Sequence, residues 1–373
     1  MPLPVDSHLG ECFCPERTPA HERRAGPPPS KLAPAWRDRP QAEGCTSERL
    51  GVRVATLAVL VMAAWMPTAA SADASYPNRP VKLLLGFTAG GGSDMVARLI
   101  AKSLGERLGQ PVVVDNKPGA GGNIAAEAAA KAAPDGYTLI LLPSGHASNA
   151  AMKKTLPFDP VAGFAWISTV TTYPVVLSVA PASPIKSFAD FLARSKAEPG
   201  KYSYSSVGVG TAMHLVGESI MADAGSSAIH VPFKGGSAPI TELLAGRVDV
   251  MVDTMTNSAP LLADKRLRAI ATTSPKGQST LPGVPAVADV LPGGIEFESW
   301  LGVATTAGTP PDVLERLNRE MRAVIAQPAV QKQLTDWGGA AKASSPAEFR
   351  ARVERDIIAL RKVVADRRIE TEP

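Results

Sequence analysis

Residues 83–98 read LLLGFTAGGGSDMVAR, an apolar run that ends in three consecutive glycines and passes directly into a helical pattern. The apolar residues of 81–87 are typical of a buried strand, and residues 93–108 repeat apolar side chains with a helical period. Glycines at such a junction let another group come close to the backbone. The stretch therefore predicts a strand, a glycine turn and a helix N-terminus, which together can bind an anion.

The same alternation of strands and helices continues through the rest of the chain. Further strands are expected at 111–116, 137–142, 175–179, 202–206, 229–233, 248–252, 267–273 and 301–305. Helices are expected at 124–133, 187–196, 211–224, 239–245, 309–326 and 345–366. This order predicts an α/β fold with a mostly parallel sheet covered by helices. No flexible linker interrupts it, so we expect two domains connected by ordered strands at 170–179 and 295–304.

The first 72 residues differ in composition from the rest. Residues 1–48 are rich in Pro, Arg and Glu and lack periodicity, which predicts either a disordered extension or sequence upstream of the true translation start. Residues 49–72 have a charged start, an apolar run and small residues before a cleavage point, as in a signal peptide cut after Ala72. A membrane anchor is the alternative, but the apolar run is shorter than the ~20 residues of a spanning helix.

Charge and cysteine content exclude several kinds of protein. The formal net charge is +4 and the basic residues are scattered, which argues against a nucleic-acid partner. All three cysteines lie before the cleavage point, so the mature chain has no disulfide and no thiolate ligand. No metal-binding spacing such as H-E-x-x-H occurs. We expect neither a metal nor a cofactor.

Two more glycine loops repeat the strand-to-helix junction, SSVGVGT at 205–211 and, more loosely, KGGSAP at 234–239. If the two halves of the alternation face each other, the loops at 90–93, 205–211 and 234–239 converge on one cleft. GAGGN at 119–123 is interpreted as a structural turn. None of the loops completes the dinucleotide fingerprint G-x-G-x-x-G, and no P-loop is present.

A hydrolase is a second interpretation. Three histidines follow the cleavage point, His146, His214 and His230. Ser144 or Ser206 could act as a nucleophile with His146 or His214 as its base. However, no G-x-S-x-G elbow supports this chemistry.

The segment from YPNRPVKLLLGFTAGGGSDMVARL at 76–99 through VVVDNKPGAGGN at 112–123 strongly resembles the tripartite tricarboxylate transporter substrate-binding proteins, the Bug family. The resemblance continues in YSYSSVGVGTAMHL at 202–215, HVPFKGG at 230–236 and LLAGRVDVMVD at 243–253. It extends over nearly all of 76–366. Phe233 and Leu301 stand where relatives often have Tyr, which leaves room for a less polar ligand.

The resemblance implies a type II periplasmic binding-protein fold with two doubly wound α/β lobes and a ligand cleft between them. The first lobe would comprise 73–172 and 296–373, and the second 173–295. It also implies a monomeric, non-catalytic periplasmic protein that captures a small carboxylate and delivers it to membrane permease subunits. The carboxylate would be a di- or tricarboxylate, an amino-acid-like acid or an aromatic acid. A ligand-sensing subunit that reports to a membrane kinase is a further alternative with the same fold.

Positions that match the family's ligand loops form the expected binding site. In the first lobe these are Thr88, Ala89, Gly90, Gly91, Ser93, Ser144, His146 and Asn149. In the second lobe they are Ser206, Gly208, Gly210, Thr211, His214 and Asp253, with Asn257 nearby. Asp94 is expected to cap its helix, because a carboxylate directed at an anionic ligand would repel it.

The signal peptide leads to a direct prediction. Protein purified from the periplasm should begin at Asp73, because cleavage follows Ala70-Ser71-Ala72. N-terminal sequencing of that protein measures the start. Mass spectrometry of the precursor adds a control: peptides from residues 1–48 would contradict a translation start near Leu50 or Val52.

Overall fold

The computed structural model describes residues 76–235, 237–275 and 281–371. The expected N-terminal extension, signal peptide and cleavage point after Ala72 lie outside these residues. Within the described ranges, no helix combines the length and the apolar character needed to cross a bilayer.

The first lobe is built on a sheet with the strand order β2-β1-β3-β9-β4. Its strands are β1 (Val81–Leu85), β2 (Val112–Asn116), β3 (Thr138–Pro143), β9 (Glu298–Thr306), the first part of β4 (Phe164–Val179) and the short β10 (Ala340–Ala341). The strands β1, β2 and β3 run parallel to one another, whereas β9 is antiparallel to both β3 and β4.

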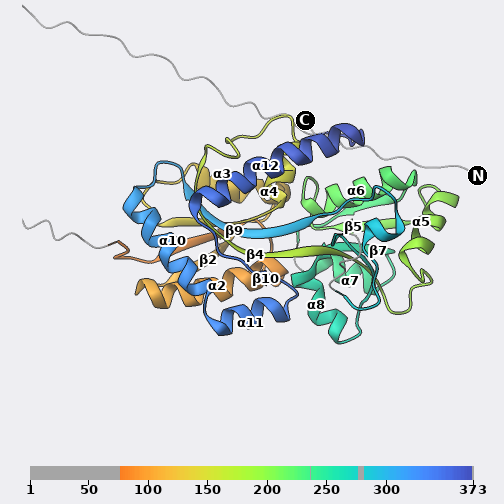
Figure 1. Ribbon diagram of the computed structural model, residues 1–373, viewed down its shortest axis with the longest axis horizontal. Helices are drawn as coiled ribbons and strands as arrows, with labels where there is room; N and C mark the ends of the chain where they lie inside the picture. Colours follow the sequence, from red (N-terminus) through yellow and green to blue (C-terminus); the bar gives the residue numbers. More distant parts are fainter. Residues whose placement is uncertain (1–75, 236, 276–280, 372–373) are drawn as a thin grey trace, which may run out of the picture. The chain divides into compact units, whose positions relative to one another are not determined.

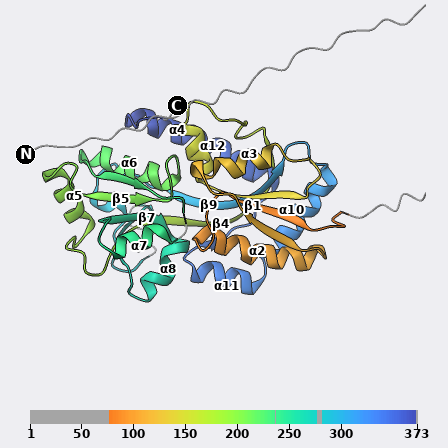
Figure 2. The ribbon, with the colours of Figure 1, turned by 180° about the vertical axis from the view of Figure 1, so that it is seen from behind.

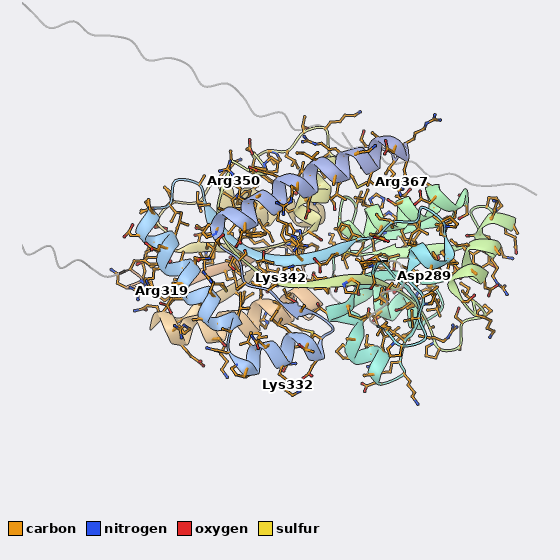
Figure 3. The ribbon with its side chains drawn as sticks, in the orientation of Figure 1. Asp289, Arg319, Lys332, Lys342, Arg350 and Arg367 are labelled. Atoms are coloured by element: carbon orange, nitrogen blue, oxygen red, sulfur yellow. The ribbon has the colours of Figure 1, made fainter. Side chains whose placement is uncertain are left out.

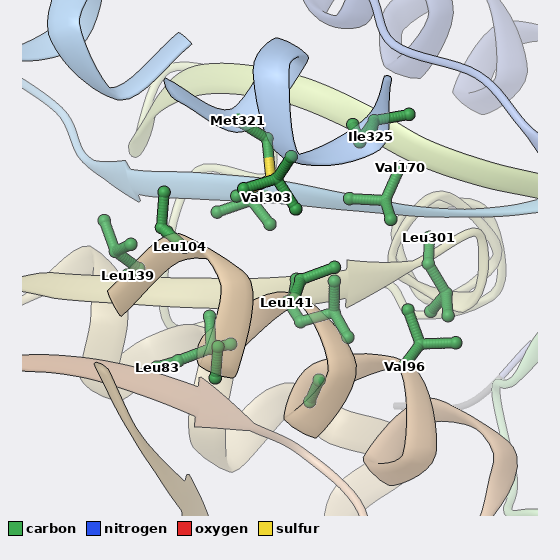
Figure 4. Close-up of a cluster of buried hydrophobic side chains, with 14 of the residues drawn as sticks. Leu83, Val96, Leu104, Leu139, Leu141, Val170, Leu301, Val303, Met321 and Ile325 are labelled. Carbon is green, nitrogen blue, oxygen red and sulfur yellow. The ribbon is translucent and has the colours of Figure 1, made fainter. Parts of the chain in front are cut away.

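Helices cover both faces of this sheet (Figures 1 and 2). One face carries α2 (Gly92–Leu108), α10 (Pro311–Ile325) and α11 (Pro328–Asp336). The other carries η1 (Ala120–Gly122), α3 (Asn123–Ala130), α4 (Gly145–Met152) and α12 (Pro346–Asp366). Figure 4 shows how the first face is filled: Leu83 of β1, Val96 of α2 and Met321 of α10 meet in one buried apolar cluster.

The second lobe is built on the strand order β4-β7-β5-β6, and β8 also pairs with β4. Its own strands are β5 (Ser203–Ser206), β6 (Ile229–Pro232), β7 (Val250–Thr254) and β8 (Arg268–Thr272). Its helices are α5 (Phe188–Ala197), α6 (Ala212–Ala224), α7 (Ala238–Leu244), α8 (Met255–Ala263) and α9 (Val287–Val290). A separate apolar cluster, centred on Phe188, Phe191 and Tyr204, forms its core.

Strand β4 connects the two lobes. Residues 164–174 of β4 pair with β9 in the first sheet, and residues 175–179 pair with β7 and β8 in the second. The chain returns to the first lobe through β9, whose Glu298 lies opposite Pro174. The prediction that ordered strands at 170–179 and 295–304 connect the two halves is therefore confirmed. The residue boundaries of the lobes remain a prediction.

The α/β fold class and each of the expected strands are confirmed. The expectation of a mostly parallel sheet is wrong, because β4 leaves the first lobe and β9 returns to it, and both pair antiparallel with their neighbours. Three of the expected helices begin with a capping residue: the side chains of Ser187, Thr211 and Ser345 accept hydrogen bonds from the first turns of α5, α6 and α12. Strand β4 begins at Phe164, earlier than either the strand expected at 175–179 or the connecting strand expected at 170–179. The helices α4, α8, α9 and α11 were not expected, because none is longer than nine residues and so short a segment does not establish a helical period.

Charged side chains lie around the outside of this framework. Figure 3 shows Arg319 on α10, Lys332 on α11 and Arg350 on α12, each on a different helix. Several of the ion pairs join residues one helical turn apart, such as Lys332 with Asp336 and Arg350 with Glu354. Exposed pairs of this kind contribute about 0.3–0.5 kcal/mol each, so burial of the apolar clusters dominates stability.

A tight contact between β9 and α12 yields a stability prediction. A Cβ added at Gly302 would lie 2.2 Å from the ring of Phe349, which is fully buried between Trp166 and Trp300. Gly302→Ala should therefore destabilise the protein by about 1–3 kcal/mol through overpacking. Urea unfolding measures the loss. The double variant Gly302→Ala/Phe349→Leu is the control, and it should lose less than the sum of the two single changes.

Candidate functional site

A narrow cavity of about 40 Å³ lies where the two lobes meet. Both lobes contribute to its walls. From the first lobe come Phe87, Thr88, Gly91, Gly92, Ser93, Asp94, Pro143, Ser144, Gly145 and Tyr173. From the second come Val207, Thr211, Ala212, Met213, Gly235, Asp253, Thr254 and Asn257. Among these lining residues there is no lysine and no arginine.

Four helices begin at this cavity. Each follows the carboxyl end of a strand: α2 follows β1, α4 follows β3, α6 follows β5, and α8 follows β7. Residues at the cap or in the first turn of all four helices line the cavity. The first N–H groups of a helix have no partner within the helix, and the helix dipole is positive at that end. The cavity is therefore surrounded by hydrogen-bond donors and partial positive charge from both lobes.

The head of α2 is held in place by Asp94. Its carboxylate accepts hydrogen bonds from the Gly90 N–H at 3.0 Å and from Arg98, one turn further along the helix, at 2.9 Å. Burial alone would raise the pKa of Asp94, but the bonds from Arg98, Gly90 and Asn116 outweigh it and keep the pKa below its ordinary value. Asp94 thus stays ionised and its charge is paired with Arg98. The expectation that Asp94 caps α2 is wrong: the N-cap is Gly91, and the carboxylate instead bonds the Gly90 N–H ahead of the helix.

The head of α6 is organised by Thr211. The Thr211 hydroxyl donates to the Gly208 carbonyl at 2.6 Å and accepts from the His214 N–H at 3.4 Å. Gly208 and Gly210 have φ angles of 141° and 76°, which only glycine adopts without strain. The loop bends sharply at these two glycines, so that Thr211, Ala212 and Met213 face the cavity.

A chain of hydroxyl groups forms the wall beside α4. The Ser144 hydroxyl lies 2.7 Å from that of Ser299, and Ser299 is also hydrogen-bonded to the Tyr173 hydroxyl. Burial raises the pKa of Tyr173, so it remains a neutral donor or acceptor. Ser144 and Tyr173 line the cavity, and they can pass a hydrogen bond to a ligand without bringing a charge.

Asp253 is the unusual group of the cavity. Only 1% of its surface is exposed, and its oxygens accept from the Thr254 N–H at 2.6 Å and from the Asn257 amide at 2.5 Å. Both partners are neutral. Burial raises the pKa of Asp253 to about 6, although these hydrogen bonds act in the opposite direction. A carboxyl group that is mostly ionised at neutral pH therefore faces the cavity without a counter-ion.

The cavity brings together six of the residues expected from the sequence. Thr88, Gly91, Ser93 and Ser144 line it from the first lobe, and Thr211 and Asp253 from the second. The remaining expected residues do not line it: Ala89, Gly90, His146, Asn149, Ser206, Gly208, Gly210 and His214. Ala89 and Gly90 are exposed, and the Gly90 N–H is already bonded to Asp94.

His146 faces the core of the first lobe. It is 4% exposed and stacks on Phe158, with Phe164 and Trp166 at its edges. Its Nε2 lies 2.7 Å from the Pro160 carbonyl oxygen. Burial lowers the pKa of His146 to about 4, and the bond to Pro160 opposes that only in part. A neutral imidazole bonded to a carbonyl in an aromatic cluster is a structural group, which explains its absence from the cavity.

Asn149 braces the two lobes against each other. Its amide donates to the Gly121 carbonyl at 3.0 Å, and a Cβ at Gly210 of the second lobe would lie 2.3 Å from its oxygen. The turn 119–123, interpreted from sequence as structural, also approaches the second lobe: a Cβ at Gly121 would lie 2.6 Å from the Val209 carbonyl oxygen. Glycine is required here because two lobes touch.

A second hollow of about 260 Å³ lies outside the cavity. Phe87 and Val207 line both hollows and separate them. Gly208 lines this outer cleft rather than the cavity. Two lysines, Lys153 and Lys234, also line it, so the cationic side chains lie outside the wall formed by Phe87 and Val207.

The serine–histidine pairs of the hydrolase interpretation do not form as expected. Ser144 is bonded to Ser299 rather than to His146. Ser206 lies 2.7 Å from Nε2 of His230, not His214, and Ser206 has no exposed surface. A nucleophile must reach its substrate, and this hydroxyl is enclosed behind the 207–211 loop.

The residues His214, Glu218 and His230 are the group most suited to hold a metal, since their ligand atoms lie within 4.8 Å of one another. However, the two imidazole rings stack with a centroid distance of 4.0 Å and an angle of 14°. A metal ion lies in the plane of each imidazole that binds it, so stacked rings cannot share one ion without turning. Nδ1 of His214 also accepts from the Gly210 N–H. The stack instead supports the loop at the head of α6.

Several cavity residues were missed by reasoning from the sequence. They are Phe87, Pro143, Gly145, Tyr173, Ala212, Met213 and Thr254. Gly92, Val207 and Gly235 also line the cavity, and each lies in one of the glycine loops expected to converge on a cleft. Pro143, Gly145 and Thr254 were missed because the helices α4 and α8 were not expected. The signals that could have found α8 are Thr254 and Asn257, because the Thr254 hydroxyl accepts from the Asn257 N–H as an N-cap. The internal Pro260 obscures that helix in the sequence.

Comparison with known proteins gives a consistent result. The family described as "Tripartite tricarboxylate transporter family receptor" matches residues 96–362. A protein of Pseudomonas sp. (strain P51), described as "UPF0065 protein in tcbD-tcbE intergenic region", is 36% identical over 266 residues, which cover 71% of this chain and 79% of that protein.

Three solved structures extend the similarity to the fold. The periplasmic binding protein BugD has a TM-score of 0.75 at 30% identity, covering 80% of this chain and 100% of BugD. A Rhodopseudomonas palustris protein solved with adipate has a TM-score of 0.74 at 34% identity, with coverages of 78% and 98%. MatC of the same organism, with bound malate, has a TM-score of 0.74 at 28% identity, with coverages of 78% and 100%.

The raised pKa of Asp253 leads to a prediction of pH-dependent stability. The folded protein holds the Asp253 proton up to about pH 6, whereas an unperturbed aspartate releases it near 3.8. Proton binding thus stabilises the folded state at low pH, and this contribution is lost as the pH rises through about 6. Asp253→Asn removes the titration. Its unfolding free energy should exceed that of the parent by as much as about 3 kcal/mol at pH 8 and by little below pH 4.

Urea unfolding of the ligand-free proteins between pH 3.5 and pH 8 measures this difference. The control is Asp223→Asn, which also removes a carboxylate but breaks the ion pair with Arg367. That variant should be less stable than the parent at pH 8. A difference between Asp253→Asn and the parent that does not change with pH would contradict the assignment.

Proposed function

The chain belongs to the tripartite tricarboxylate transporter receptor family, and from this premise we propose that it is a solute-binding protein that captures a small carboxylate between its two lobes. The observation that carries the proposal is the convergence of four helix N-termini on one cavity. Their N–H groups can hold a carboxylate without an arginine, because backbone donors and the helix dipoles together supply the favourable field.

The ligand class is supported from two directions. Adipate and malate, found with two of the similar structures, are both dicarboxylates, although each observation concerns that protein alone. In this chain the walls add the hydroxyl groups of Ser93 and Ser144 as neutral donors, and Phe87, Val207 and Met213 as apolar surface. We propose that the carboxylate lies at the heads of α2, α4 and α6 and that the carbon skeleton lies against the apolar wall.

Lobe closure is the proposed binding motion. The lobes would be 73–172 with 296–373, and 173–295, connected through β4 and β9. The head of α2 already touches the second lobe, since a Cβ at Gly92 would lie 3.0 Å from the Asn257 nitrogen and 3.2 Å from the Thr254 hydroxyl. A ligand that bonds to helix N-termini of both lobes binds the closed form more tightly and shifts the population toward it.

The cellular setting follows from the family and the leader sequence. We propose that the protein acts in the periplasm as a monomer without catalytic activity and passes its ligand to membrane permease subunits. The fully buried Ser206 hydroxyl and the absence of His146 from the cavity support a binding role over hydrolysis. The transport assignment is tested by using the ligand-loaded protein to capture partners from membranes. It should capture permease subunits, and capture of a membrane kinase instead would contradict the assignment.

Ligand binding should stabilise the protein. Small mono- and dicarboxylates screened by thermal unfolding should raise the melting temperature with increasing concentration, because they bind only the folded state. At a concentration 100 times Kd the gain is about 2.7 kcal/mol. The matching methyl esters are the control and should have no effect. If none of the acids raises the melting temperature, the proposed function is wrong.

Blocking the contact at Gly92 should weaken binding without unfolding the protein. The side chain in Gly92→Val would meet Thr254 and Asn257 in the closed form, at a cost of about 1–3 kcal/mol. The affinity for the acid identified in the screen should fall by roughly 5- to 150-fold in calorimetry. The matched control is Lys102→Val, which places the same side chain at an exposed position of α2 and should leave the affinity unchanged.

A further inference from the structure

Asp253 differs from the other buried carboxylates of the described chain in having no counter-ion. Asp94 is paired with Arg98, and Glu320 is paired with Arg107 and Arg319. Asp253 is as buried as these groups, yet all of its hydrogen-bond partners are neutral: the N–H and the hydroxyl of Thr254 and the Asn257 amide. Burying an unpaired charge is costly, so a protein that binds an anion gains nothing from this group unless the ligand uses it.

The geometry around Asp253 favours its acceptor form. Each of its two oxygens already accepts one hydrogen bond, Oδ1 from the Thr254 N–H and Oδ2 from the Asn257 amide. In a protonated carboxyl, the oxygen that carries the proton would place its O–H close to a group that is already donating to that oxygen. An ionised carboxylate accepts both bonds and still has further lone pairs, so it can accept another hydrogen bond from the side of the cavity that Asp253 lines.

The cavity offers no other charge to offset Asp253. Its remaining titratable groups are Asp94, which is neutralised by Arg98, and Tyr173, which is held in its neutral form. The nearest lysines among the lining residues, Lys153 and Lys234, face the outer cleft beyond Phe87 and Val207. No cationic partner of Asp253 is therefore present among the residues that line the cavity, and a ligand can supply a further donor.

Resting on the proposed function, we propose that Asp253 selects the ligand: the protein binds a carboxylate that also carries a hydroxyl or an ammonium group, and that group donates a hydrogen bond to Asp253. The two ends of such a ligand meet opposite environments. Its carboxylate lies at the helix N-termini, and its donor group lies at the one anionic wall. An unsubstituted acid can occupy the same space but leaves Asp253 without its partner.

The loss on removing the donor group is expected to be large. A hydrogen bond to a charged group contributes about 1.5–3 kcal/mol, and a site that is built to accept one penalises a ligand without it. Expressed as affinity, the substituted acid should bind roughly 10- to 150-fold more tightly than its unsubstituted match.

Calorimetry with matched acids tests the proposal on the protein purified from the periplasm. The four-carbon set is succinate, malate and aspartate, and the three-carbon set is propionate, lactate and alanine. Within at least one set the hydroxy or the amino acid should bind more tightly than the unsubstituted acid, and the comparison between these two distinguishes a hydroxyl from an ammonium group. The advantage should shrink as the pH falls from 7.5 to 5, because protonation of Asp253 removes the acceptor.

Two variants separate selection by Asp253 from general stabilisation. Asp253→Asn keeps the shape but removes the charge, and it should reduce the advantage of the substituted acid to less than about threefold, within the range of a neutral hydrogen bond. Asp223→Asn removes a carboxylate outside the cavity and should leave the advantage unchanged.

The possible failures are distinguishable. If unsubstituted acids bind as tightly as substituted ones in the parent protein, the selection by Asp253 is wrong while the proposed function stands. If unsubstituted acids bind more tightly and gain affinity as the pH falls, Asp253 acts as a protonated donor and the proposal is overturned. If no acid of either set binds, both this inference and the proposed function fail for small carboxylates.

Discussion

The binding cavity depends on one strand that belongs to two sheets. Residues 164–174 of β4 pair with β9, and residues 175–179 pair with β7 and β8, so the two lobes share a continuous backbone. The carboxyl ends of β1 and β3 in one lobe, and of β5 and β7 in the other, then lead into helices whose N-termini meet at the cavity. Ligands of open α/β sheets bind at the carboxyl ends of the strands. Here two such edges face each other, and each lobe provides two of the four helix N-termini.

This arrangement explains how an anion site can lack a cationic side chain. Helix N-termini present N–H groups in fixed directions and lose no side-chain entropy on binding, whereas a lysine or arginine loses rotamer freedom and attracts any anion. The cost lies in the loops, which must bend sharply and let two lobes touch. Glycine makes this close contact possible at Gly92 and Gly121, because a Cβ added there would lie only 3.0 and 2.6 Å from atoms of the opposite lobe.

The sequence predicted what is local and missed what depends on distant contacts. The strands, the glycine junctions and the caps at Ser187, Thr211 and Ser345 follow from neighbouring residues, and the structure contains them. His146 was expected in the site because it matches a position of the family's ligand loops, but α4 turns its ring toward Phe158 and Trp166, which come from elsewhere in the chain. The environment of Asp253 was equally hidden, because the absence of a cation becomes visible only when all the walls are assembled.

Two carboxylates of one cavity illustrate why position in the fold, rather than residue type, decides a role. Asp94 lies in the first turn of α2 and is bonded to Gly90 and Arg98. Its charge therefore stabilises the loop and is neutralised by a residue of the same lobe. Asp253 lies near the end of β7, where its two partners are neutral and its burial raises the pKa to about 6. In the proposed role of Asp253, a hydrogen bond from a donor group of the ligand offsets the free energy that burial of the carboxylate costs. An unbound state that is destabilised in this way discriminates between ligands more sharply than a fully satisfied pocket could, because the wrong ligand leaves that cost in place.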